Sequence, residues 1–210
     1  MIISKNYIKR LSKYKNALYR LRALGLVKIF SDNLADAVGV KSSQVRKDFS
    51  LFGIKGSKKG GYQVNELIEQ LNGILGKKEQ YRVVLVGIGN IGNALINYNG
   101  FEGEGIKIVA GFDIEPEKYS INDSLPIMHV KTLSEYVVNN NIKIAIIAVP
   151  DTAAQQVLDS LILSGIKGVL NFAPIRLKAP DSVVINNVNI VLEIESVIYY
   201  VNNLAIAEKL

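Results

Sequence analysis

Residues 87–92, Gly-Ile-Gly-Asn-Ile-Gly, place three glycines between an expected strand at 81–86 and an expected helix that contains Ala94, Leu95 and Ile96. In this setting Gly87 makes a tight turn, Gly89 lets the backbone approach a pyrophosphate, and Gly92 permits close helix packing. Amide hydrogens at the helix N-terminus attract the same anion. We therefore predict cofactor contacts, with a nucleotide-free glycine turn as the alternative, from Gly87, Ile88, Gly89, Asn90, Ile91 and Gly92.

A carboxylate follows the next expected strand, residues 107–112, at Asp113, twenty-one positions after Gly92. A carboxylate at that place can accept both ribose hydroxyls of an adenosine, and it would repel a 2′-phosphate. The pattern therefore predicts that the cofactor is NAD, as NADH or NAD⁺, rather than NADP.

Apolar runs at 142–149, 168–172, 182–185 and 188–193 predict further strands, which alternate with helices. This alternation favours a doubly wound parallel sheet of the Rossmann type. Ligands on such sheets lie beyond the carboxyl ends of the strands, so we expect a second wall of the pocket there. Its residues, unless they only shape loops, are Val149, Pro150, Asn171 and Phe172.

Charge divides the chain into two modules. The first eighty residues carry sixteen Lys and Arg against six Asp and Glu, a net charge of +10, whereas the rest carry nine against thirteen. A basic module beside a mildly acidic one predicts a polyanionic partner for the first, with lysines that only solvate a surface as the alternative. We expect a first domain at 1–78, a dinucleotide-binding domain at 79–194 and a terminal helix at 195–210.

The basic module has the periodicity of a helix-turn-helix domain. An apolar stripe at spacings of three and four predicts a first helix that ends at Gly25. Two short helices follow, one at 32–38 with Ser31 as its expected N-cap and one that begins after its expected N-cap, Ser42, and runs to about Ser50. This order predicts a helix-turn-helix, which often binds DNA.

The polar face of the last of these helices carries Ser43, Gln44, Arg46 and Lys47. Glutamine can pair with adenine and arginine with guanine, while serine and lysine contact phosphates, so the helix suits a major groove. The glycine-rich residues 52–62 predict a β-hairpin wing whose lysines would follow the DNA backbone or enter the minor groove. These lysines are Lys55, Lys58 and Lys59. A solvated helix face and an ordinary basic hairpin are the alternatives.

The chain has no cysteine and one histidine, His129. Disulfides and thiolate zinc sites are excluded, and His129 has no adjacent acidic partner, so we predict neither catalytic nor metal-binding residues. A signal segment and an apolar run of about 18 residues are both missing, which predicts a cytoplasmic protein without a membrane partner.

Residues 196–210 predict a helix whose apolar side chains exceed one narrow stripe. Left free, the helix would expose a large apolar patch, so we expect it to be buried against a second copy of the chain. A two-fold symmetric dimer would also present two recognition helices to a two-fold related DNA site. Packing on its own domain is the alternative.

Five motifs occur in order along the chain. They are Val-Lys-Ser-Ser-Gln-Val-Arg-Lys-Asp-Phe-Ser at 40–50, the wing from Phe52 to Tyr62, the glycine loop, Phe112-Asp113, and Asn171-Phe172-Ala173-Pro174. Together, over nearly the whole chain, they resemble the Rex family of redox-sensing transcriptional repressors.

This resemblance implies a homodimer with an N-terminal winged-helix domain, a Rossmann domain and a C-terminal helix swapped between subunits. It implies repression at palindromic operators near fermentation and respiration genes, with release when NADH replaces NAD⁺. It also implies a switch that involves Tyr98, Asn189 and Arg10. The family's usual aspartate aligns with Asn189, which keeps hydrogen bonding without the charge, and Lys58-Lys59 replace a commoner Arg-Gly pair.

Two other functions remain open on the residues alone. A small NAD-dependent oxidoreductase would use the basic N-terminus only for assembly and would turn over a substrate. A DNA-binding regulator of another kind would hold a different adenosine ligand in the same pocket.

Overall fold

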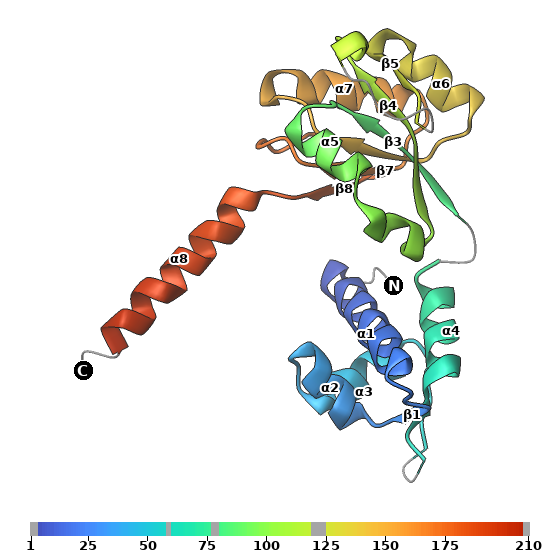
Figure 1. Ribbon diagram of the computed structural model, residues 1–210, viewed down its shortest axis with the longest axis vertical. Helices are drawn as coiled ribbons and strands as arrows, with labels where there is room; N and C mark the ends of the chain where they lie inside the picture. The colour runs from blue at the N-terminus through green and yellow to red at the C-terminus, as the bar shows by residue number, and fades with distance from the viewer. Residues whose placement is uncertain (1–3, 58–59, 77–79, 119–124, 208–210) are drawn as a thin grey trace. The chain divides into compact units, whose positions relative to one another are not determined.

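A computed structural model describes residues 4–57, 60–76, 80–118 and 125–207. The chain divides into two compact units, residues 1–79 and 80–210 (Figure 1). Each unit is described by itself.

Four helices and a two-stranded sheet form the N-terminal unit. They are α1 (Lys5–Ala23), β1 (Lys28–Ile29), α2 (Ser31–Val38), α3 (Ser42–Leu51), β2 (Tyr62–Gln63) and α4 (Val64–Ile74). The α1 helix packs against both α2 and α4, and α2 packs against α3. Leu11, Tyr14 and Leu18 of α1 are fully buried together with Val45 and Phe49 of α3, so the predicted helix-turn-helix closes around one apolar core.

The expected N-caps at Ser31 and Ser42 are wrong. Both serines are the first residues of their helices, and the residues before them, Phe30 and Lys41, have extended backbones without a side-chain cap. The Ser31 hydroxyl is engaged elsewhere, because its oxygen accepts a hydrogen bond from Arg46 at 3.0 Å.

Part of the β-hairpin wing expected at 52–62 lies within the described residues. There Ser57 and Gly61 form an antiparallel bridge with two backbone hydrogen bonds of 2.9 and 3.1 Å. Beyond this bridge, β2 pairs antiparallel with β1, so that Tyr62 lies opposite Ile29. The strand that follows the bridge, β2, therefore pairs with β1, which lies between α1 and α2 in the chain.

The C-terminal unit contains a six-stranded sheet in the order β5-β4-β3-β6-β7-β8, and all its neighbouring strands are parallel. The strands are β3 (Tyr81–Val86), β4 (Ile106–Asp113), β5 (Ile127–His129), β6 (Ile144–Ile147), β7 (Gly168–Asn171) and β8 (Val184–Asn187). The order reverses beside β3, which is where a doubly wound sheet opens a crevice for a ligand. The predicted Rossmann-type fold is confirmed.

Helices cover both faces of this sheet. They are α5 (Asn90–Ile96), α6 (Leu133–Asn139) and α7 (Asp151–Leu163), with short 3₁₀ turns at η1 (Asn99–Glu104), η2 (Pro116–Lys118) and η3 (Val130–Thr132). Successive side chains of a strand point to opposite faces. Val84 and Val86 of β3 accordingly pack with α6 and α7, whereas Val83 and Leu85 pack with α5.

The strand expected at 188–193 is wrong, because a helix, α8 (Ile190–Ala207), begins there. The Asn189 side-chain oxygen accepts hydrogen bonds from the backbone amides of Val191 at 3.0 Å and Leu192 at 3.4 Å, as an N-cap does. The cap starts a helix at a run of apolar residues whose pattern is compatible with either a helix or a strand.

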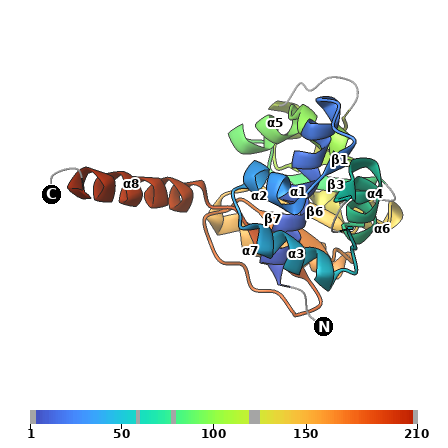
Figure 2. The same ribbon diagram turned by 90° about the horizontal axis from the view of Figure 1, so that it is seen from below.

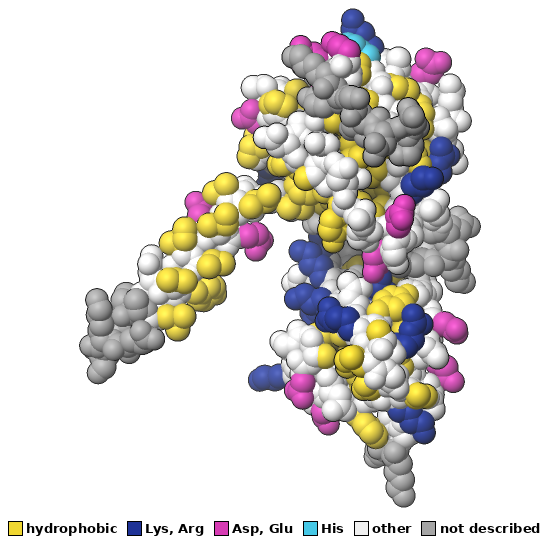
Figure 3. Space-filling view, in the orientation of Figure 1, with side chains coloured by type: hydrophobic (Ala, Val, Ile, Leu, Met, Phe, Trp, Pro, Cys, Tyr) yellow, Lys and Arg dark blue, Asp and Glu magenta, His cyan; other side chains and the backbone are white. Residues whose placement is uncertain are grey.

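In Figure 2 α8 is one continuous helix near the C-terminus. Every side chain of α8 from Ile190 to Leu204 is exposed, although most of them are apolar (Figure 3). Val197, Ile198, Tyr200 and Val201 each expose more than half of their surface. Among the described residues, no helix is long and apolar enough to cross a membrane. These exposed apolar side chains, which we call the apolar α8 surface, are not covered by any other described residue.

Candidate functional site

A cavity of about 800 Å³ opens at the carboxyl ends of the central strands. Its walls include Gly87 and Gly89 after β3, Asp113 at the end of β4, and Val149 and Pro150 after β6. The volume falls in the range of cofactor sites. These five residues are among those predicted from the sequence to contact a dinucleotide.

The glycine loop has the geometry that a bound pyrophosphate requires. Gly87 adopts a φ of +94°, which favours glycine, and a Cβ on Gly92 would overlap the carbonyl oxygen of Gly87. Gly89 differs from both, because a Cβ placed there would meet no atom within 4 Å. Gly89 therefore leaves a bare stretch of backbone open to the cavity, and the loop fits a dinucleotide.

The Asp113 carboxylate joins β4 to the glycine loop. Its Oδ2 accepts a hydrogen bond from the backbone amide of Ile88 at 2.8 Å, and its Oδ1 accepts one from the amide of Glu115 at 3.1 Å. A carboxylate has about four acceptor sites. The two sites that these bonds leave can accept ribose hydroxyls in the cavity.

Six predicted cofactor residues do not line this cavity: Ile88, Asn90, Ile91, Gly92, Asn171 and Phe172. Asn171 is fully buried, and its side chain bonds Ala173, Ile175 and Asn187. Its polar atoms thus hold the loop after β7. Direct cofactor contacts by these six residues stay predictions.

Several lining residues were not predicted from the sequence. Ile114 and Glu115 follow Asp113, whereas Lys131 and Ser134 follow β5. The rule that ligands lie beyond strand ends applies to β5 as well. The signal was weak, because β5 has only three residues.

The N-terminal unit presents the predicted DNA-binding residues on α3 and in the wing. Ser43, Arg46, Lys47 and Lys55 are exposed, and Gln44 is half-buried. Arg46 donates to Ser31 and lies 3.7 Å from the Asp32 carboxylate, but such an exposed ion pair contributes little and can be exchanged for a phosphate or a base. Lys58 and Lys59 lie outside the described residues.

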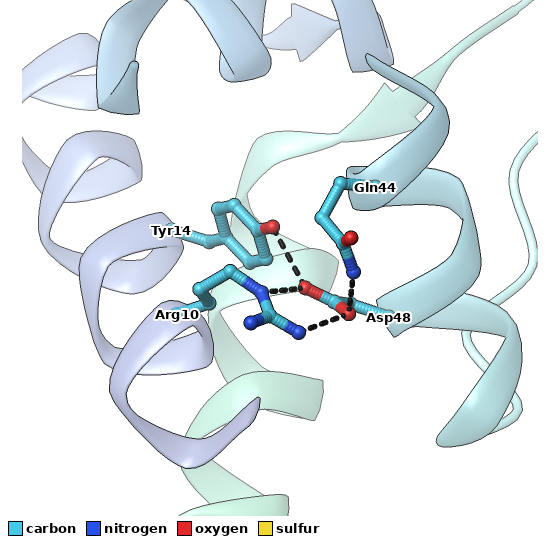
Figure 4. A network of polar contacts seen from close by, with 4 residues as sticks. All are labelled: Arg10, Tyr14, Gln44 and Asp48. Carbon is cyan, nitrogen blue, oxygen red and sulfur yellow. Dashed lines mark hydrogen bonds and ion pairs between the residues drawn. The ribbon is translucent and has the colours of Figure 1, made fainter. Parts of the chain in front are cut away.

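Three side chains converge on the buried carboxylate of Asp48, a residue of α3 (Figure 4). Arg10 of α1 binds both oxygens, with Nε 2.6 Å from Oδ2 and Nη2 2.8 Å from Oδ1. The Tyr14 hydroxyl donates to Oδ2 at 2.8 Å, and the Gln44 amide nitrogen donates to Oδ1 at 2.6 Å. We call this set, Arg10, Tyr14, Gln44 and Asp48, the Asp48 network.

The Asp48 network shifts the pKa values of its members in opposite directions. Burial by itself would raise the pKa of Asp48, but hydrogen bonds from Arg10, Tyr14 and Gln44 outweigh it and lower that pKa below its ordinary value. Burial and the bond to Asp48 raise the pKa of Tyr14, and the same carboxylate raises the pKa of Arg10. Asp48 is therefore ionised at neutral pH.

The three predicted switch residues lie in different settings. Tyr98 is exposed, and its ring meets the Phe101 ring edge-on at a centroid distance of 5.0 Å. Asn189 caps α8, whereas Arg10 is bound to Asp48 inside the N-terminal unit. Their roles in switching stay predictions.

Within the described ranges, no group of His, Asp and Glu side chains has the arrangement of a metal site.

Two family models match the chain: "Putative DNA-binding protein N-terminus" at residues 2–50 and "CoA binding domain" at residues 78–175. These matches fall on the two compact units.

Two crystal structures of the Rex-family repressor RSP resemble the whole chain at 35% sequence identity. The complex of RSP with β-NAD⁺ and operator DNA has a TM-score of 0.91, and the alignment covers 100% of this chain and 97% of that one. The complex of RSP with β-NADH has a TM-score of 0.88, with 100% and 99% covered.

A winged-helix unit and a dinucleotide-binding unit in one chain define a DNA-binding regulator with a ligand domain. The relative from Bacillus licheniformis, named redox-sensing transcriptional repressor Rex, is 38% identical over 96% of this chain and 94% of its own length. A relative of the same name from Clostridium tetani is 39% identical over 95% of each. The chain belongs to the Rex family of redox-sensing transcriptional repressors, which confirms the predicted resemblance.

The glycine loop generates a paired prediction. Gly92→Ala should lower the free energy of unfolding by at least about 2 kcal/mol, because its Cβ would overlap the Gly87 carbonyl. Gly89→Ala should leave thermal unfolding unchanged and weaken NADH binding at least about tenfold, because its methyl group enters the cavity. Calorimetry measures both quantities. Equal losses of stability in the two variants would contradict this geometry.

The Asp48 network generates a prediction about pH. Because the pKa of Asp48 is lower in the folded than in the unfolded chain, its contribution is full above the unfolded pKa of about 3.9 and is lost as the pH falls through the folded pKa. Asp48→Asn should cost about 2–4 kcal/mol of unfolding free energy at pH 7 and progressively less below pH of about 4.

Urea unfolding at several pH values measures this difference, with Asp36→Asn on the exposed side of α2 as the control. The control should stay within about 0.5 kcal/mol of the unmodified chain at every pH. A cost for Asp48→Asn that grows toward acidic pH would show that the sign is wrong.

Proposed function

We propose that this chain represses transcription by binding palindromic operator DNA as a homodimer and that it releases the operator when NADH occupies its pocket. The observation that carries the proposal is the presence, in one Rex-family chain, of a fitting dinucleotide cavity and an exposed basic recognition helix. The related repressor RSP has been crystallised with NAD⁺ and operator DNA and with NADH. The oxidoreductase alternative is set aside, because the relatives are named as repressors.

On this proposal α3 enters the major groove and the wing follows the neighbouring backbone. Gln44 and Arg46 contact base edges, and Ser43 and Lys47 contact phosphates. Lys55 lies on the exposed part of the wing and adds a further phosphate contact. Lys58 and Lys59, outside the described residues, are proposed to do the same.

The C-terminal unit would hold the dinucleotide through the backbone of the glycine loop and the two remaining acceptor sites of Asp113. Asp113 also bonds the amide of Ile88, so ligand contacts at the ribose and the shape of the loop are coupled. Lys131 and Ser134 are the polar side chains on the wall beyond β5. The proposed cofactor is NAD, as either NADH or NAD⁺.

The two oxidation states differ by one positive charge and by the planarity of the nicotinamide ring. A ligand shifts an equilibrium only if it binds the two conformations with different affinities. A shift from 1:99 to 99:1 needs about 5.5 kcal/mol, toward which two sites of a dimer can both contribute. We propose that Tyr98, Asn189 and Arg10 take part in this differential binding.

The apolar α8 surface would be covered by the second copy of the chain. Its side chains from Ile190 to Leu204 are exposed in the single chain, and apolar surface of this extent is typical of protein interfaces. A homodimer presents two recognition helices related by a two-fold axis, which matches a palindromic operator. We place its action in the cytoplasm, where DNA and the free nicotinamide pool meet.

Operator binding measured against the NADH to NAD⁺ ratio tests the sensor function. The chain first selects a duplex from a random pool, and that duplex is then labelled with a fluorophore. The chain should bind it in the presence of NAD⁺, and the affinity should fall at least about tenfold when NADH replaces NAD⁺. Coenzyme A is the ligand control, because the family model that matches residues 78–175 is described as a CoA binding domain. Operator affinity that ignores the ratio would overturn the sensor proposal.

Charges placed on α8 test the dimer. Val197→Asp combined with Val201→Asp should convert the dimer to monomer in sedimentation experiments at micromolar concentration, because each carboxylate would be buried without a partner. Asn202→Asp on the same helix is the matched control and should remain dimeric. A doubly substituted chain that remains dimeric would show that dimerisation uses another surface.

A further inference from the structure

The Asp48 network contains one bond that bears on DNA recognition and not only on stability. Gln44 and Asp48 are one helical turn apart on α3, and the Gln44 amide nitrogen donates to Asp48 Oδ1 at 2.6 Å. Figure 4 shows the nitrogen of the Gln44 amide turned toward the carboxylate and its oxygen turned away. The orientation of this amide decides which hydrogen-bonding groups the recognition helix presents.

An ionised carboxylate has acceptors and no donor. Only the NH₂ group of Gln44 can therefore face Asp48, and the reversed amide would bring two oxygens together. The Asp48 carboxylate is held from the other side by Arg10 and Tyr14, whose three bonds measure 2.6 to 2.8 Å. Asp48 is completely buried, so water does not replace any of these donors.

We propose that Asp48 is a specificity-determining positioning residue, which sets the base preference of Gln44 by fixing the orientation of its amide. This inference rests on the proposed function, in which α3 enters the major groove. A free glutamine can turn its amide by a half-turn at little cost and so present either a donor or an acceptor. Held by Asp48, Gln44 directs its oxygen outward as an acceptor and keeps its second N–H beside it.

An outward acceptor matches the exocyclic amino groups of adenine and cytosine in the major groove, and it repels guanine O6 and thymine O4. The second N–H can donate to adenine N7, so adenine gains two bonds where cytosine gains one. The expected preference at the Gln44 base pair is therefore adenine first, cytosine second, and guanine and thymine last.

The alternative is that Asp48 only braces α3 against α1. A residue that only stabilises the fold changes the fraction of active protein and changes the affinity for every DNA sequence alike. A positioning residue affects the relative affinities for the four bases at one position, and only while Gln44 is present. The two roles therefore separate in a double-mutant cycle scored on base preference.

The test uses the full-length dimer and a palindrome that it selects from a random duplex pool. Competition binding on all single base-pair substitutions of one half-site is measured for the unmodified chain, Gln44→Ala, Asp48→Asn and the double variant. Gln44→Ala identifies the base pair that Gln44 contacts. Asp48→Asn offers an NH₂ group that lets the Gln44 amide turn, so the preference for adenine over guanine at that base pair should fall about tenfold.

In the Gln44→Ala background, Asp48→Asn should leave the preference at that base pair unchanged. Tyr14→Phe is the matched control, because it removes a bond to Asp48 without changing the partner of Gln44, and it should keep the preference for adenine. An equal loss of affinity for all four bases in Asp48→Asn would overturn the inference, and so would the same change of preference with and without Gln44.

A second measurement, on the unmodified chain, tests the inference if the Asp48→Asn variant does not fold. In the ¹H–¹⁵N spectrum of the unmodified chain at neutral pH, the Gln44 side-chain amide is assigned by its loss in Gln44→Ala. One of its two protons should be shifted downfield and should exchange slowly with solvent. Two protons that exchange as fast as those of a free glutamine would contradict the inference.

Failure of the proposed function gives a different result from failure of the inference. An unmodified dimer that enriches no sequence from the pool contradicts both. A dimer that enriches a palindrome, with an unaltered base preference after Asp48→Asn, contradicts only the role of Asp48.

Discussion

The buried Asp48 carboxylate ties α3 to α1 in the N-terminal unit, because a charge without water must have hydrogen-bond donors around it. Four bonds from Arg10, Tyr14 and Gln44 occupy both of its oxygens. Three of the bonds come from α1, so the recognition helix cannot rotate on α1 without breaking them. The same carboxylate touches Gln44 on the polar face of α3. Stability and the presentation of that face therefore depend on one ion.

A second carboxylate, Asp113, has a related position and a different role. It also joins two segments, the end of β4 and the glycine loop, but its two bonds come from backbone amides and leave acceptor sites toward the cavity. Asp48 is satisfied by protein donors alone, whereas Asp113 is satisfied in part. This difference is the one expected between a structural carboxylate and a carboxylate proposed to bind a ligand. It supports the proposal that binding at the ribose is transmitted to the loop through the Ile88 amide.

Local patterns predicted much of this structure, and contacts over long separations account for what they missed. The strand at 81–86 and the glycine spacing were predictable because they are short-range features, and β3 and the turn at Gly87 lie where expected. Asp48 was not predicted to be the acceptor of a buried hydrogen-bond network, because its partner Arg10 is 38 residues away in the sequence. Its place beside Val45 on the buried face of α3 was the available signal. The start of α8 was mistaken for a strand, because the Asn189 cap decides between two structures that the apolar run allows equally.

The central claim is that pocket and operator are coupled through conformations with different affinities for each ligand. Coupling of this kind is reciprocal, so operator DNA must shift the affinity for NADH relative to that for NAD⁺ by the same factor by which replacing NAD⁺ with NADH weakens operator binding. Calorimetry of NADH and of NAD⁺ binding to the protein, with and without saturating operator duplex, measures this factor directly. We predict that the operator raises the dissociation constant for NADH, relative to that for NAD⁺, at least about tenfold. The same ratio of the two dissociation constants with and without operator would contradict this coupling.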